Sequence, residues 1–241
     1  METLTPVQPP RPARPATAAK PSRLERALLP TALTAIGVGL LLLLGTLASQ
    51  VLGISNVYWY LSRSSALVAF TLLWASMVLG VGITNRLARL WPGAPTAFDL
   101  HQYVSLLGIG FALVHVLTLL GDTYIGYNLA QLLIPFGSTE YAPFWVGIGQ
   151  VALYLLIPVT LSFYVRKRLG TRGWRTIHGL SYALYGLTLL HSIFSGSDSG
   201  AVWTTLLYSF TALSLVGLTA YRVLLARSGV ASRSVSRHSA A

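Results

Sequence analysis

Apolar residues in this chain gather into long runs rather than into the short alternating patterns of a soluble domain. A bilayer core requires about 20 consecutive apolar residues per helix, and six runs approach or exceed that length. They cover residues 28–51, 64–83, 100–120, 144–165, 176–194 and 201–225. The pattern predicts an all-α membrane protein, a bundle of six transmembrane helices joined by short loops.

The composition agrees with this prediction, because 54% of the 241 residues are hydrophobic and only 10% are charged. A soluble domain carries roughly a quarter charged residues. We expect a disordered, Pro-rich basic cytoplasmic arm over residues 1–26, a transmembrane domain over residues 27–226 and a basic cytoplasmic tail over residues 227–241. Because a polar arm precedes the first run, we interpret that run as a retained helix rather than a cleaved signal.

The basic residues are concentrated at the termini and in every second predicted loop. If the six helices alternate in direction, all but one of the 17 Lys and Arg residues lie on one side. Arg63 alone lies on the other side, together with Asp122, Glu140 and Asp198. Since Lys and Arg are enriched in cytoplasmic loops, both termini are expected in the cytoplasm of a multi-pass protein, most simply in the plasma membrane. This sorting also explains the net charge of +11 without a nucleic-acid partner.

Four of the five histidines lie within the predicted spans, where ionisable side chains are expensive and usually functional. His101 and His115 are fourteen residues apart in the third span, and His178 and His191 are thirteen apart in the fifth. Both spans run from the cytoplasm outward. The histidines should therefore form an inner level and an outer level, roughly 20 Å apart at 1.5 Å per residue.

Two levels of paired histidines predict two b-type haems, each with two imidazole ligands. Neutral imidazole tolerates burial, and two axial ligands leave no open position for oxygen, which favours electron transfer. The chain has no cysteine, so thiolate ligation and cysteine-bound iron–sulfur clusters are excluded within it. No carboxylate accompanies the histidines within the spans, which disfavours a non-haem iron or zinc centre.

Helical geometry fits the two histidine pairs unequally. On an ideal helix, fourteen residues return to within about 40° of the starting face, whereas thirteen leave His178 and His191 about 140° apart. The fifth span must therefore twist, and the sequence shows no cause for this. Three glycines near the histidines would let a flat macrocycle approach the backbone, although they also suit helix packing. These are Gly108, Gly179 and Gly186.

These features resemble the transmembrane domain of the ferric reductase-like family, which includes ferric-chelate reductases, NADPH oxidases and the haem subunit of periplasmic methionine sulfoxide reductase. The resemblance covers about residues 57–200. It rests on VYWYLSRSSALVAF, the His101/His115 pair, VRKRLGTRGWRTIHGLSYALYGLTLLH and the following SGSDSG. It implies that His101 pairs with His178 and His115 with His191 as ligands of haem iron. The sequence departs from the family in one respect: ferric reductases and NADPH oxidases continue into a cytoplasmic flavin and nicotinamide domain, whereas little sequence follows the sixth span here. We therefore expect the electron donor to be a separate cytoplasmic flavoprotein.

Two arginines are candidate partners of haem propionates. Arg63 lies at the outer mouth of the second span, where snorkelling among interfacial aromatic residues is the favoured alternative explanation. Arg175, with Arg172, precedes His178 and could bind inner propionates or an acidic donor protein, while also setting the topology. On the outer side, Asp198 could bind a cationic acceptor or be a solvated carboxylate. The apolar stretch YNLAQLLIPF in the loop 122–143 is too short to span and could cap the outer haem.

The sequence therefore predicts transmembrane electron transfer from a cytoplasmic flavoprotein, through two haems, to an external acceptor such as ferric iron or oxygen. The chain would be the membrane component of an oxidoreductase, and whether it is itself an enzyme stays open. A second hypothesis is a haem subunit that delivers electrons to a periplasmic oxidoreductase protein such as methionine sulfoxide reductase. A third, of another class, is a haem-free channel or scaffold, which predicts no cofactor.

Overall fold

The computed structural model describes residues 56–85, 87 and 93–238, together with scattered residues between 33 and 53. The arm predicted over residues 1–26 and part of the first apolar run lie outside this described part. Those residues of the run 33–51 that are described are helical. In α8, side chains are described as far as Arg227.

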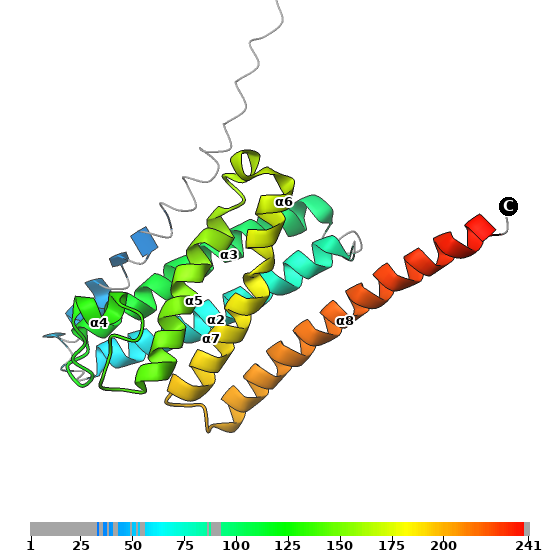
Figure 1. The fold of residues 1–241 in the computed structure, drawn as a ribbon. Coiled ribbons are helices and arrows are strands. Elements are labelled where there is room, and N and C mark those ends of the chain that lie inside the picture. Colours follow the sequence, from blue (N-terminus) through cyan, green and yellow to red (C-terminus); the bar gives the residue numbers. More distant parts are fainter. Residues whose placement is uncertain are drawn as a thin grey trace, which may run out of the picture.

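Helices account for every regular element of the described residues, and Figure 1 shows them packed side by side. The elements are α2 (Val57–Thr84), α3 (Ala94–Thr118) with the 3₁₀ turn η2 (Leu119–Gly121), α4 (Leu129–Leu133), α5 (Pro143–Leu161), α6 (Arg166–Gly179), α7 (Ser181–Ser195) and α8 (Val202–His238). Prolines stand in the first turns of α3 and α5, where the missing N–H costs no helical hydrogen bond. The all-α prediction is confirmed.

Among the described residues, four helices are long and apolar enough to cross a membrane, whereas the sequence predicts six spans in the whole chain. They are α2, α3 with η2, α5 and the part of α8 from Val202 to Arg227. The fifth predicted span is not one helix, because α6 ends at Gly179 and α7 has only 15 residues. Fifteen residues reach about 22 Å, less than the roughly 30 Å of a bilayer core. The first predicted span is only partly described.

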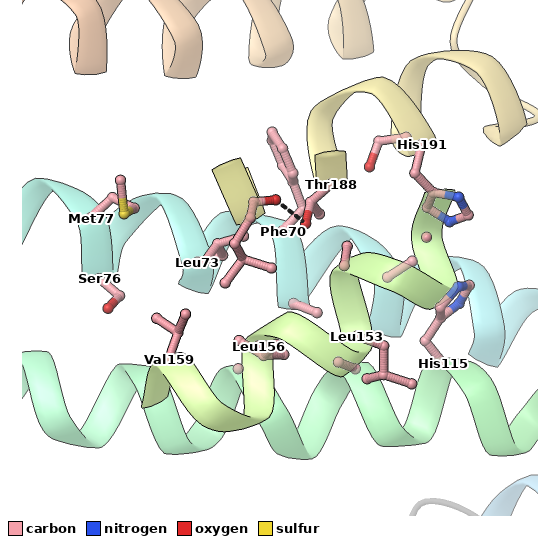
Figure 2. Close-up of a pocket in the computed structure, with 18 of the residues that line it drawn as sticks. Phe70, Leu73, Ser76, Met77, His115, Leu153, Leu156, Val159, Thr188 and His191 are labelled. Atoms are coloured by element: carbon pink, nitrogen blue, oxygen red, sulfur yellow. Dashed lines mark hydrogen bonds between the residues drawn. The ribbon is translucent and has the colours of Figure 1, made fainter. Parts of the chain in front are cut away.

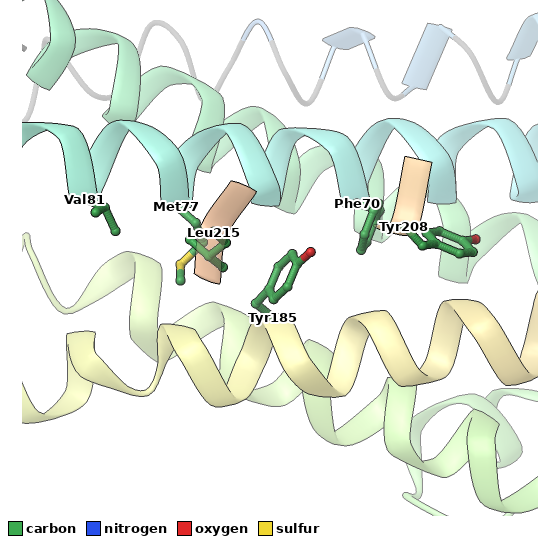
Figure 3. Close-up of a cluster of buried hydrophobic side chains, with 6 residues drawn as sticks. All are labelled: Phe70, Met77, Val81, Tyr185, Tyr208 and Leu215. Carbon is green, nitrogen blue, oxygen red and sulfur yellow. The ribbon is translucent and has the colours of Figure 1, made fainter. Parts of the chain in front are cut away.

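The buried core holds α2 against α7 and α8. Phe70, Met77 and Val81 of α2 meet Tyr185 of α7, together with Tyr208 and Leu215 of α8 (Figure 3). The Phe70 ring stands edge-on to Tyr208, with ring centroids 5.3 Å apart. On the other side of the bundle α2 packs along α3, and α5 packs along α7. This arrangement leaves α3, α5 and α7 around a common space beside α2.

Candidate metal centres with two histidine pairs

The four histidines that the sequence places within spans form two pairs between α3 and the α6–α7 segment. The imidazole centroids of His101 and His178 are 6.0 Å apart, and we call these residues the inner pair. Those of His115 and His191, the outer pair, are 6.3 Å apart and face each other in Figure 2. Along α3 the two pairs are separated by fourteen residues, about 21 Å of helix. The structure thus brings together the residues expected at each level.

A local break between α6 and α7 supplies a small part of the twist that the sequence left unexplained. Leu180 separates the two helices, and its N–H donates to the carbonyl of Ile177, three residues back, at 3.1 Å. Such a 3₁₀ step advances by about 120° per residue instead of about 100°. The step contributes only about 20° of the roughly 140° that separates His178 from His191 on an ideal helix, yet both rings lie beside histidines of α3.

Both pairs line one cavity of about 1160 Å³. Small-molecule sites usually occupy roughly 300–1,000 Å³, so this space can hold more than one ligand. Between the two levels its wall is mainly apolar, with Leu153 and Leu156 of α5 opposite Phe70 and Leu73 of α2 (Figure 2). A ligand in this space would be largely shielded from water.

Three of the four imidazoles are anchored through Nδ1 to main-chain carbonyls. His101 donates to the carbonyl of Ser76 at 2.9 Å, and His115 donates to that of Ser62 at 2.9 Å. His191 donates to the carbonyl of Trp145 at 2.8 Å. Because a carbonyl oxygen only accepts, Nδ1 must carry the proton in each case, and Nε2 keeps its lone pair. Histidines that bind metals almost always have such an outer hydrogen bond.

Small residues open these helix carbonyls to the imidazoles. Four residues after Ser62, Ser76 and Trp145 come Ala66, Gly80 and Gly149. A Cβ at Gly149 would lie 2.5 Å from Nδ1 of His191, and one at Gly80 would lie 3.3 Å from Cε1 of His101. A larger residue at position 149 would therefore block the approach of the His191 ring to the carbonyl, whereas alanine at position 80 would only press lightly on the His101 ring.

Sequence reasoning missed these anchors, although a signal was present. Ser62 and Ser76 are fourteen residues apart on α2, the same spacing as the histidines of the antiparallel α3. Of the expected glycines, Gly108 and Gly179 line the cavity. A Cβ at Gly179 or Gly186 would meet nothing within 4 Å, so neither glycine is needed for contact with a histidine.

The spacing of each pair fits a metal ion shared between two imidazoles. A metal–imidazole nitrogen bond is about 2.0–2.1 Å long, and the ring centre lies about 1.1 Å behind the nitrogen, so two opposed rings have centroids about 6.3 Å apart. The measured values of 6.0 and 6.3 Å match this separation. The rings are tilted by 80° and 64° to each other, which two ligands on opposite sides of a metal permit. The separation of the rings in both pairs therefore fits a metal ion held between two histidines.

The charged residues expected around the site have different surroundings. Arg63 forms an ion pair with Asp198 and lies over the ring of Trp59, 4.7 Å from its centroid. Asp198 is thus a paired carboxylate and not merely a solvated one. Arg175 is exposed, and both arginines line the cavity, Arg63 toward the outer pair and Arg175 near the inner pair.

The loop 122–143 folds back over the outer end of α5. Gln150 of α5 donates to the carbonyls of Gln131 and Leu132 at 2.6 and 2.9 Å, and its side-chain oxygen accepts from the N–H of Phe136 at 3.0 Å. Leu132 of α4 lines the cavity. The apolar stretch of this loop therefore covers the outer end of the cavity.

Two curated proteins are similar to part of this chain. Magnetosome protein MamZ of Paramagnetospirillum magneticum is 27% identical over 126 residues, which are 52% of this chain and 19% of MamZ. MamZ of Magnetospirillum gryphiswaldense is 25% identical over the same length and shares. The match thus spans about a fifth of the length of these curated relatives.

No solved structure matches the chain. The family model that matches is not that of the ferric reductase-like domain, so the assignment to that family was wrong. It is the model described as a domain of unknown function, DUF8596, and it matches residues 57–198, more than half of the sequence. The chain belongs to the DUF8596 family.

Proposed function

We propose that this protein carries single electrons across a membrane through two b-type haems, one held by each histidine pair. The observation that carries this proposal is the pair geometry. The ring centroids of the two imidazoles are 6.0 Å apart in the inner pair and 6.3 Å apart in the outer pair, at two levels of one largely apolar cavity. Three of the four imidazoles donate a hydrogen bond from Nδ1 to a main-chain carbonyl.

A haem explains this ligand set better than a bare metal ion does. Protein zinc and non-haem iron centres take three or more side-chain ligands. Among the described residues, no group of three or more His, Asp or Glu side chains lies together. A haem would bring nitrogen ligands of its own, so two histidines at each site would be enough to hold it. The cavity volume of about 1160 Å³ is also more than one bare ion would require.

When bound, a haem would supply one-electron chemistry, and the chain supplies the surroundings. His101, His115 and His191 present Nε2 in a fixed orientation because their Nδ1 is tied to the backbone. The apolar wall between the levels would exclude water, which favours passage of electrons over release of reactive products.

We propose that the inner pair faces the cytoplasm and that six spans cross the membrane, with both termini cytoplasmic. The inner pair adjoins α6, which carries five cations and no acidic residue: Arg166, Lys167, Arg168, Arg172 and Arg175. This is the charge pattern of a cytoplasmic loop. The α6–α7 segment would count as one crossing, because it reaches both histidine levels. The first apolar run would supply the remaining span.

The electrons would come from a separate cytoplasmic flavoprotein and pass to an external acceptor, ferric iron or oxygen. The basic surface of α6 would suit an acidic donor protein near the inner pair. The membrane would be the plasma membrane, and the similarity to two magnetosome proteins supports no finer assignment.

The test is a reduced-minus-oxidised visible spectrum of the full chain purified in detergent, with haem measured per chain. We expect two b-type haems in the wild type and one each in His101→Ala and His115→Ala. His238→Ala, outside the predicted spans, is the matched control and should keep two. A folded wild type without haem, despite haem supply during expression, would refute the proposal and favour a channel or scaffold.

A further inference from the structure

The inner and outer pairs differ in how their imidazoles are held. Both outer rings have Nδ1 anchored, His115 to Ser62 and His191 to Trp145. In the inner pair only His101 is anchored, to Ser76. Nδ1 of His178 is buried but has no hydrogen-bond partner among the described residues.

His178 is held mainly by an aromatic neighbour on its own helix. The indole of Trp174, one turn earlier, stacks on its imidazole with ring centroids 5.4 Å apart and a plane angle of 24°. Stacking restrains the plane of the ring but leaves the choice of protonated nitrogen open, and Nε1 of Trp174 is itself buried without a partner. The anchoring of His178 is therefore weaker than that of the other three histidines.

The helices that carry the two ligands also differ in packing. His191 lies on α7 against α5, close enough that a Cβ at Gly149 would overlap its ring. His178 lies in the last turn of α6, a helix without a buried residue, and a Cβ at the adjacent Gly179 would meet nothing within 4 Å. The helix that carries His178 is therefore less tightly packed than the one that carries His191.

We infer that the two haem sites are unequal: the inner site binds haem more weakly and exchanges its His178 ligand for a small external ligand, whereas the outer site stays closed. The inference rests on the proposed function. Loss of an outer hydrogen bond from a metal ligand typically lowers metal affinity about 10–100-fold. The ligand class is a small neutral molecule that binds ferrous haem, for which carbon monoxide is the probe.

The first experiment titrates haem-free wild type with haemin. We expect two phases of equal amplitude whose dissociation constants differ by about 10–100-fold. His115→Ala, which keeps only the inner pair, should retain the weaker phase, and His101→Ala, which keeps only the outer pair, the tighter one. Equal affinities, or a tighter inner site, would overturn the inference while leaving the proposed function intact. No haem binding by folded wild type would instead overturn the proposed function.

The second experiment adds carbon monoxide to the dithionite-reduced protein and follows the Soret band. We expect the band of half the haem to shift in the wild type, nearly all of it in His115→Ala and none in His101→Ala. The wild-type amplitude does not depend on the folding of a variant. Shifts of all the haem, of none, or of the outer site alone would each overturn the inference.

Discussion

Replacement of Gly149 by alanine tests whether the outer ligand depends on access to a helix carbonyl. The new Cβ would lie 2.5 Å from Nδ1 of His191 and 2.6 Å from its Cε1. Carbon contacts are optimal at roughly 3.5–4.0 Å, so the ring or α5 must move by about 1 Å. The 2.8 Å bond from His191 to the carbonyl of Trp145 would then stretch to about 3.8 Å and be lost.

The expected result is a weaker outer haem site. Loss of the outer hydrogen bond should raise the dissociation constant about 10–100-fold, which corresponds to about 1.4–2.8 kcal/mol. The assay is haemin titration of Gly149→Ala in the His101→Ala background, where only the outer pair remains. Overpacking by the methyl group adds a destabilisation of about 1–3 kcal/mol, which thermal unfolding reports separately.

Gly186→Ala is the matched control, because a Cβ there would meet nothing within 4 Å. It makes the same chemical change in α7 and should leave haem affinity unchanged, while alanine favours the helix by up to about 1 kcal/mol. The reasoning is refuted if Gly149→Ala binds haem as tightly as its parent, or if both substitutions weaken binding equally.

Three further predictions concern the surroundings of the cavity. In the His115→Ala background, Trp174→Leu should weaken haem binding at the inner site, whereas Trp174→Phe should largely preserve it because phenylalanine keeps an aromatic face against His178. Equal haem dissociation constants for the two variants would contradict the role of stacking. The side chains of Arg63 and Asp198 are about a quarter exposed. A double-mutant cycle with alanine at both positions, measured by thermal unfolding, should therefore give a coupling free energy of about 0.2–1 kcal/mol. A coupling of zero would show that the pair does not form in solution. Gln150→Leu should expose the loop 122–143 to limited proteolysis, because it removes three hydrogen bonds and leaves buried backbone groups unpaired at about 1–3 kcal/mol each, and unchanged cleavage would exclude this anchoring role.

The membrane class and the histidine levels could be predicted from sequence because each depends on chain distance alone. An apolar run either is or is not long enough to cross a bilayer, and the predicted runs 64–83, 100–120 and 144–165 fall close to α2, α3 and α5. Likewise, a helix rises by a constant amount per residue, so the histidine spacings placed two levels at matching depths. The count of six spans stays a prediction, because the first run is only partly described and the break at Leu180 divides the fifth run into two shorter helices.

Only the tertiary structure decided how the histidines are oriented and held. The anchors of His101, His115 and His191 are main-chain carbonyls of other helices, and every residue has such a carbonyl. Which carbonyl becomes accessible depends on the rotation and register of the packed helices, so residue types could not identify it. The ion pair of Arg63 with Asp198 arises in the same way, from residues far apart in sequence. The sequence by itself determined which side chains lie at which depth, whereas packing between helices determined which of them face one another and what restrains them.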